Sequence, residues 1–294
     1  MTHGYQNIFG TKVEIQIGDP EPNHLTTHKK QNALYDFAMN AAFEEMNKVH
    51  KLISFQDPQS EVSKINRLLI EGEGVSCVHP WTFEMLQISK QLYEHTKGLF
   101  DSGVAHYLLK WGVLPNHLNC RKNRRFTQST LANVKLMNGN FISVNTPVCL
   151  DLGGVSKGYA VDRAIEVLRT LGIKNASVNA GGNSKVIGMH SQKQLIKGQE
   201  SEQAYLSLKD FHQDSVSITA PHASVRSLNR KNMSNLVNPI TGEAVLVSDI
   251  FAVAASSCAI AEGLSKALAI HKNLDAEYFN ALQAKPVMIE VHRQ

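Results

Sequence analysis

A glycine pair at 153–154 separates an apolar segment from an amphipathic one, and this arrangement constrains the chain more than any other feature. Residues 148–152 predict a strand, the glycine pair a turn, and residues 157–171 a helix that Gly172 ends. A glycine pair lets the backbone turn tightly and leaves room for another group to come close. The order strand, turn and helix therefore places a helix start beside an open stretch of backbone.

A second glycine pair, at 181–182, predicts another tight turn, between strands predicted at 176–179 and 185–187. Because strands outnumber simple β-α-β units, the order favours an α+β fold, in one large domain, 1–294, of two intimate lobes. The other strands are predicted at 8–17, 205–208, 216–218, 251–255 and 287–291, and the other helices at 31–53, 62–69, 80–95 and 258–270.

Composition narrows the possible partners. The chain has 294 residues, of which 43% are hydrophobic, and a net charge of +4, which suits an anionic small ligand. The basic run at 121–125 is interpreted as a solvated loop, and no nucleic acid is expected because aromatic residues that stack on bases are sparse beside it.

The cysteines and the apolar runs bear on location. The four cysteines, 77, 120, 149 and 258, are widely scattered, which is typical of reduced thiols in the cytoplasm. No apolar run reaches the length of a transmembrane segment. The sequence as it stands predicts a cytoplasmic protein; an exported or lipoprotein form whose leader had been removed would look the same.

The first glycine pair suggests a phosphate site. A helix start presents unpaired N–H groups and the positive end of the helix dipole, and Lys157 adds a cation in the first turn. The alternative is that both pairs are tight turns required only by packing. Neither G-x-G-x-x-G nor G-x-x-x-x-G-K-[ST] is present, so the two common nucleotide motifs are excluded.

Ordered segments along the chain resemble the ApbE family, the FAD:protein FMN transferases. The central one is D-L-G-G-V-S-K-G-Y-A-V-D at 151–162, followed by V-N-A-G-G-N at 178–183. The others are F-G-T at 9–11, S-F-Q-D-P-Q-S-E-V-S-K-I-N at 54–66, G-L-F-D at 98–101 with W-G at 111–112, N-P-I-T-G at 238–242 and A-E-G-L-S-K-A-L at 261–268. The resemblance covers roughly residues 8–290.

The resemblance implies an ApbE-like (T-fold-like) architecture of mixed sheets with packed helices, and a site for FAD and Mg²⁺. Such enzymes move FMN from FAD to a threonine hydroxyl of an acceptor flavoprotein and release AMP, and some members hydrolyse FAD instead. By the matching motifs, the FAD contacts would be Phe9, Gln56, Leu99, Phe100, Asp101, Asp151, Lys157, Asn179, Gly181, Gly182 and Val237. The metal would be held by the Gly154 carbonyl and Glu262, with Ser265 and Lys266 on the next turn of the helix.

Two departures fall at the implied metal position. Glu262 replaces the family's Asp and remains a hard oxygen ligand that Mg²⁺ accepts. Lys266 replaces the family's Thr, and its ammonium would repel a metal or replace part of its charge. The alternative is a simple i,i+4 ion pair between Glu262 and Lys266. Ser265 is the remaining oxygen donor on that turn.

Further departures concern the proton acceptor. Asn235 replaces the family's histidine, and an amide does not accept a proton at neutral pH. Asn183 and Asn238 each replace an Asp. His222 is a substitute candidate for the base, against the alternative of a surface or packed histidine. Phe9 and Gln56 stand where the family has Met and an aromatic residue.

Three functions follow as hypotheses. The first is an FMN transferase with Mg²⁺, whose catalysis is impaired or uses a changed base. The second is a non-catalytic FAD-binding or regulatory protein, motivated by Asn235 and Lys266. The third is an FAD pyrophosphatase, in which water takes the place of the acceptor protein.

Overall fold

The computed structural model describes residues 2–18, 28–118, 129–188, 193–197, 203–207, 213–228 and 231–287. Its centre is a seven-stranded sheet in the order β1-β2-β6-β7-β10-β15-β16, in which every neighbouring pair is antiparallel. The strands are β1 (Thr2–Ile8), β2 (Thr11–Ile17), β6 (Ala176–Ala180), β7 (Asn183–Ile187), β10 (Ser215–Thr219), β15 (Phe251–Ala255) and β16 (Ala284–Val287).

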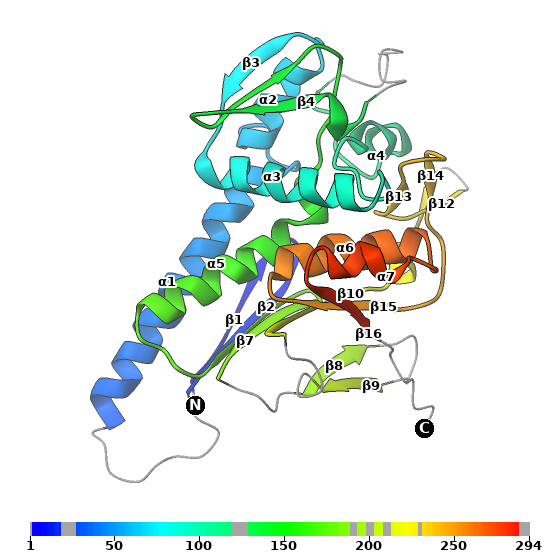
Figure 1. Ribbon diagram of the computed structural model, residues 1–294. Coiled ribbons are helices and arrows are strands. Elements are labelled where there is room, and N and C mark those ends of the chain that lie inside the picture. The colour runs from blue at the N-terminus through cyan, green and yellow to red at the C-terminus, as the bar shows by residue number, and fades with distance from the viewer. Residues whose placement is uncertain are drawn as a thin grey trace.

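Three helices cover one face of this sheet (Figure 1): α1 (His28–Ile53), α5 (Ser156–Thr170) and α6 (Cys258–Ile270). Their apolar residues and those of the central strands form the main core. Helix α6 is buried along most of its length because α3 (Pro80–His95) packs over it from the side away from the sheet. A helix buried on several sides must be apolar nearly all round, as the sequence of α6 is.

A smaller layer lies beyond α3 (Figure 1). It contains α2 (Glu61–Leu69), α4 (Ala105–Trp111) and a three-stranded sheet in the order β3-β5-β4. The strands of this sheet are β3 (Gly74–Cys77), β4 (Val134–Met137) and β5 (Phe141–Val144). The α+β class predicted from the sequence is confirmed, with helices packed on antiparallel sheets.

Short elements complete the described chain. The two-stranded pairs are β8 (Lys193–Lys197) with β9 (Gln203–Ser207), β11 (Arg226–Leu228) with β12 (Lys231–Met233), and β13 (Val237–Asn238) with β14 (Glu243–Ala244). The remaining helical pieces are η3 (Leu131–Asn133), η4 (Leu152–Gly154), η6 (Pro221–Ser224) and α7 (Ala276–Asn280).

The predicted opening strand, 8–17, is instead the tip and second half of a hairpin. Phe9 and Gly10 have φ angles of 57° and 69°, so they form a two-residue turn between Ile8 and Thr11, which pair. This turn was not predicted because a bulky residue such as Phe9 rarely adopts a positive φ.

The predicted strand at 148–152 does not join a sheet. Its only ladder contact among the described residues is a single parallel bridge between Cys149 and Val104. The Asn66 amide bonds both the N–H and the carbonyl of Leu150, and the Asp151 N–H donates to the Ser102 carbonyl. The backbone hydrogen bonds of this extended segment are thus made with a buried side chain and a loop rather than with a neighbouring strand.

Elsewhere the predicted elements are found at or near their predicted bounds. Helix α6, helix α3 and strand β15 agree at both ends, and α2, α5, β6, β7 and β10 differ by one or two residues. Helix α4 was not predicted. The basic run at 121–125 lies outside the described residues, as do 208 and 288–291 of two predicted strands. No helix of the described chain has both the length and the apolar character that crossing a membrane requires.

Helices α5 and α6 cross at a glycine. A Cβ added to Gly158 would lie 2.4 Å from the Cys258 carbonyl oxygen, so only glycine permits the two backbones to approach this closely. Asp162, one turn further along α5, accepts hydrogen bonds from the Cys258 and Ala259 N–H groups at 3.0 and 3.1 Å. The Asp162 carboxylate therefore satisfies the start of α6 from a neighbouring helix, and it also pairs with Lys185 of β7 at 2.6 Å.

We expect Gly158→Ala to lower the free energy of unfolding by about 2 kcal/mol or more, because the helices must separate to admit the methyl group. Urea unfolding followed by circular dichroism measures the change. Gly74→Ala is the matched control, since nothing lies within 4 Å of its added Cβ. Equal stability of the two variants would contradict the close crossing.

Candidate functional site

Two hollows meet beside the start of α5. The larger has a volume of about 560 Å³ and the smaller about 210 Å³. Three side chains line both of them: Lys157, Asn235 and Lys266. The place where the hollows join is therefore marked by two ammonium groups and an amide.

The larger hollow combines aromatic and aliphatic walls with polar groups near the junction. This composition is typical of a site that holds the ring system of a small ligand. Its lining consists of Phe9, Gly10, His50, Ile53, Ser54, Phe55, Gln56, Leu108, Val113, Leu114, Asp151, Gly153, Ser156 and Arg226, besides the three shared residues.

The smaller hollow is lined by the turn after β6, the start of β7, the end of β10 and the η6 segment, among others. Gly181, in the turn between β6 and β7, lines it with a φ of 57°. A Cβ at Gly181 would lie 3.1 Å from the Thr11 side chain, so this turn also packs closely on the first hairpin. The other lining residues are Asn183, Ser217, Ile218, Thr219, Ala220, Pro221, Ser224, Leu236 and Glu262, besides the three shared residues.

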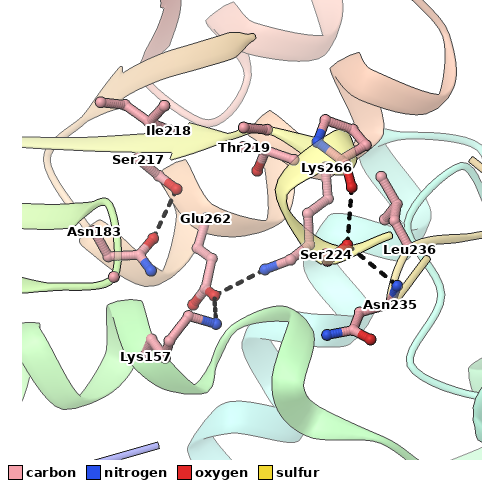
Figure 2. A pocket seen from close by; sticks show the side chains of 13 residues that line it. Lys157, Asn183, Ser217, Ile218, Thr219, Ser224, Asn235, Leu236, Glu262 and Lys266 are labelled. Carbon is pink, nitrogen blue, oxygen red and sulfur yellow. Dashed lines mark hydrogen bonds and ion pairs between the residues drawn. The ribbon is translucent and has the colours of Figure 1, made fainter. Parts of the chain in front are cut away.

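One buried carboxylate organises the junction. Glu262, only 1% exposed, receives the ammonium groups of Lys157 and Lys266, each 2.8 Å from Oε1. Figure 2 shows both lysines converging on Glu262 from different helices. The Gly158 N–H donates to Oε2 at 2.7 Å, so both carboxylate oxygens are engaged.

Lys266 makes further contacts with the glycine pair. Its Nζ lies 2.8 Å from the Gly154 carbonyl oxygen and 3.5 Å from that of Gly153. An ammonium has three N–H donors, and the two short contacts, to Gly154 and Glu262, use two of them. The i,i+4 ion pair with Glu262, one of the two alternatives left by the sequence, is present, and the same ammonium contacts the Gly154 carbonyl, the other implied metal ligand.

The charged groups at the junction shift one another's pKa values. Burial favours the neutral acid, but the ammonium groups of Lys157 and Lys266 outweigh it and hold the pKa of Glu262 below its ordinary value. Burial lowers the pKa of Lys266 to about 8, with Glu262 opposing this shift and the like charge of Lys157 adding to it. The pKa of Lys157 is raised, since the attraction of Glu262 exceeds the cost of burial.

Asp151 lines the larger hollow near the same lysines. Burial raises the pKa of Asp151, while the Gly153 N–H, which donates to its Oδ1 at 2.9 Å, and the two lysines oppose the rise. The neighbouring segment 99–102 holds Asp151 in place through the Ser102 carbonyl described above. The Phe100 ring packs under Gly154, where an added Cβ would lie only 2.9 Å from it.

The residues at the implied metal position do not fit a divalent cation in this arrangement. The oxygens that would bind it, from Glu262 and Gly154, are occupied by ammonium groups, which repel a metal ion. The Ser265 hydroxyl lies 2.7 Å from that of Thr219 and 3.0 Å from the Glu262 carbonyl oxygen, so it is engaged within its own helix and β10. Within the described residues, no cluster of three or more His, Cys, Asp or Glu side chains is arranged to hold a metal.

The asparagines that replace acidic residues are structural in this chain. Asn183 is buried, donates to the Ala180 carbonyl at 3.1 Å and accepts from the Ser217 hydroxyl at 2.7 Å (Figure 2). Asn238 Oδ1 accepts the N–H groups of Ile240 and Thr241, which forms the turn before Gly242. Both positions keep the hydrogen-bond acceptor that an Asp would supply and lose its charge.

The two candidate proton acceptors differ in position. Asn235 lines both hollows, with its backbone N–H 3.3 Å from the Ser224 hydroxyl. His222 lies in η6 between residues that line the smaller hollow, yet its side chain is not among the described residues that line either one. Its Nδ1 is buried without a hydrogen-bond partner in the described chain. The geometry favours the packed interpretation of His222.

The structure brings together only some of the predicted flavin contacts. Phe9, Gln56, Asp151 and Lys157 line the larger hollow, and Gly181 lines the smaller one. The others are not among the described residues that line either hollow: Leu99, Phe100, Asp101, Asn179, Gly182 and Val237. Asp101, for example, accepts from Gly103, Leu131 and Thr130, which ties two loops together.

Several lining residues were not singled out from the sequence. His50 contacts the Phe9 ring edge-on, with ring centroids 4.9 Å apart, and burial lowers its pKa. Arg226 brings a third cation to the larger hollow. A lone His in a long helix and a lone Arg in a short strand carry no local pattern, so only the fold reveals them.

Proteins of known structure share this fold. An ApbE protein from Thermotoga maritima aligns with a TM-score of 0.76 and 23% identity, covering 99% of this chain and 96% of that one. The flavin transferase ApbE from Vibrio cholerae aligns with a TM-score of 0.72 and 21% identity, over 99% and 96%. The fold is that of the ApbE proteins.

Sequence comparison reaches the family itself. The chain belongs to the ApbE family, whose sequence model matches residues 9–288. An FAD:protein FMN transferase from Rhodobacter capsulatus is 28% identical over 193 residues, which cover 63% of this chain and 35% of that protein. An FAD:protein FMN transferase from Buchnera aphidicola subsp. Schizaphis graminum (strain Sg) is 25% identical over 247 residues, or 77% of this chain and 70% of that protein.

We expect Glu262→Gln to destabilise the protein by about 3 kcal/mol, because two buried ammonium groups lose their shared counter-charge. Chemical denaturation measures the loss. Asp249→Asn is the control, since the Asp249–Lys272 pair is more than half exposed and should contribute little. A Glu262→Gln variant as stable as this control would show that the junction is not held by charge.

Proposed function

We propose that the chain binds FAD across the two hollows, with the diphosphate at their junction. A dinucleotide is two bulky halves joined by a short anionic link. Two hollows that meet at Lys157 and Lys266 match this division of shape and charge. This juxtaposition is the observation that carries the proposal.

The flavin half belongs in the larger hollow under this proposal. Phe9, Phe55 and Leu108 give it apolar walls on which a ring system packs, and Gln56 offers hydrogen bonds to polar ring edges. The smaller hollow has hydroxyls from Ser217 and Thr219 and the amide of Asn183 in its lining. It suits the AMP half, or the departing AMP.

The proposed reaction is transfer of FMN from FAD to a hydroxyl of an acceptor protein. The hydroxyl oxygen forms a bond to the phosphorus of the FMN half, the bond from that phosphorus to the AMP oxygen breaks, and the hydroxyl proton is lost. Membership of the ApbE family and the names of its relatives support this reaction, and the family resemblance points to a threonine of a flavoprotein as acceptor. The family resemblance implies Mg²⁺ at the diphosphate, but the residues at this junction do not fit it.

The chain's own groups would stabilise the developing charge. Lys157 and Lys266 present fixed positive charge to the diphosphate oxygens in a partly buried place, where it acts more strongly than in water. Removal of the proton from the acceptor hydroxyl is poorly catalysed, because Asn235 at the junction cannot accept it. The proposed transferase is accordingly slow.

A direct test follows FAD and the acceptor together. With FAD and a recombinant acceptor domain, we expect covalent flavin on the acceptor by in-gel fluorescence and an equal amount of AMP by chromatography. The same domain with its target threonine changed to alanine is the control. Absence of FAD binding by fluorescence quenching would reject the whole proposal, whereas free FMN and AMP without acceptor would indicate an FAD pyrophosphatase.

The second candidate is a non-catalytic FAD-binding protein, which the amide of Asn235 favours. We expect Asn235→His to raise the rate of FMN transfer at least about tenfold, because it places a proton acceptor where the hollows join. Single-turnover measurement of AMP release gives the rate, with Asn235→Gln as the amide control. If the histidine variant also binds FAD without turnover, the non-catalytic function stands instead.

A further inference from the structure

We propose that the Lys266 ammonium takes the place of a divalent cation at the diphosphate, so that FAD binds this chain without any metal. The inference rests on the proposed function and specifies how its anionic ligand is neutralised. It starts from the contacts of Nζ, which lies 2.8 Å from Glu262 Oε1, 2.8 Å from the Gly154 carbonyl and 3.5 Å from the Gly153 carbonyl.

This set of contacts is an oxygen-only environment of the kind that hard cations prefer. A carboxylate and backbone carbonyls are the groups from which proteins build magnesium and calcium sites. Here a covalently attached cation already occupies the set. A divalent ion at the same oxygens would have to displace Nζ and would face the repulsion of two ammonium groups.

The chain fixes this ammonium in position. Glu262 and Lys266 are four residues apart on α6, so they share one helix face, and the Lys266 side chain is only 20% exposed. The Gly154 carbonyl comes from η4, which Asp151 caps and Phe100 supports from below. Two segments, α6 and η4, thus hold the ammonium, and because it is covalently attached it cannot diffuse away as a metal can.

The charge balance points the same way. Among the residues that line the two hollows, Asp151 and Glu262 are the only acidic ones, and they face the two lysines of the junction, with Arg226 in the wall of the larger hollow. Asn183 contributes no charge to the smaller hollow. The described site has no spare carboxylate with which to attract a second, doubly charged ion.

The third donor of Lys266 has a use in this arrangement. The two short contacts take two N–H groups, and the contact of 3.5 Å to Gly153 is too long for a strong hydrogen bond. A phosphate oxygen at the junction would give that third N–H a stronger partner. Lys266 is in the lining of both hollows and its side chain is 20% exposed, so a ligand that spans the junction would lie against it.

The first arm of the test uses Mn²⁺ and needs no flavin. Electron paramagnetic resonance of the apo-protein titrated with Mn²⁺ should show no bound ion for the wild type. Lys266→Thr, which leaves Glu262 and Gly154 free of this ammonium, should acquire a Mn²⁺ site. Stoichiometric Mn²⁺ binding to the wild type that Glu262→Gln abolishes would overturn the proposal.

The second arm measures FAD binding by fluorescence quenching, in chelator and in excess Mg²⁺. The wild type should bind FAD equally in both. Lys266→Met, which keeps the length of the side chain and removes its charge, should weaken binding in chelator about tenfold or more. Lys272→Met is the control, because Lys272 also pairs with a carboxylate but lies on the surface. Thermal unfolding confirms that each variant is folded.

The outcomes separate the two proposals. A wild type that binds FAD only with Mg²⁺ overturns the replacement by Lys266 and leaves FAD as the ligand. A wild type that binds no FAD under either condition removes the proposed function, and the Mn²⁺ titration then still decides whether the ammonium excludes a divalent ion. Recovery of FAD binding by Lys266→Thr on addition of Mg²⁺, with an indifferent wild type, supports the replacement directly.

Discussion

The close crossing of α5 and α6 is the constraint on which the rest of the structure depends. At Gly158 the two helices approach until a backbone N–H of one helix lies 2.7 Å from a carboxylate of the other. One turn away, Asp162 of α5 serves as the cap for the start of α6. Because each helix supplies the missing hydrogen bonds of the other, neither can shift without exposing unsatisfied groups.

This crossing decides which residues face the hollows. It fixes the angle at which Lys157 leaves α5 and Lys266 leaves α6, so that both ammonium groups reach the same oxygen of Glu262. Burying a carboxylate with a single partner costs folding free energy, because the charge loses its hydration. Here two cations and an N–H compensate for that loss. The site is therefore a by-product of helix packing and needs no flexible loop to assemble the charges.

How much of the fold could be predicted from the sequence depends on how far apart in the chain the interacting residues lie. Helix α6 and strand β15 follow from apolar periodicity and were found at their predicted bounds. The segment 148–152 has the composition of a strand, but its partner is the side chain of Asn66, which lies 84 residues away from Leu150 in sequence. No local pattern reports such a pairing.

The same limit applies to the site. The motifs drew attention to Lys157, Asp151 and the glycine pairs, and Lys157, Asp151, Gly153 and Gly181 are found in the linings of the hollows. The motifs left two interpretations of Lys266 open. Lys266 pairs with Glu262 and also reaches the Gly154 carbonyl, whose position depends on how η4 packs on Phe100, and no motif reports that packing. His50 and Arg226 enter the larger hollow from a long helix and a short strand in which a single His or Arg forms no motif.

The turn at Phe9 and Gly10 has a consequence for how relatives of this chain diverge. A left-handed backbone costs a bulky residue about 1 kcal/mol, whereas Asn or Gly adopts it readily. Replacement of Phe9 by Asn or Gly should therefore leave the hairpin intact. A lineage that keeps a large side chain at this corner is under selection for what the ring touches, and a lineage that has abandoned its ligand should reveal this first by drifting to Asn or Gly there.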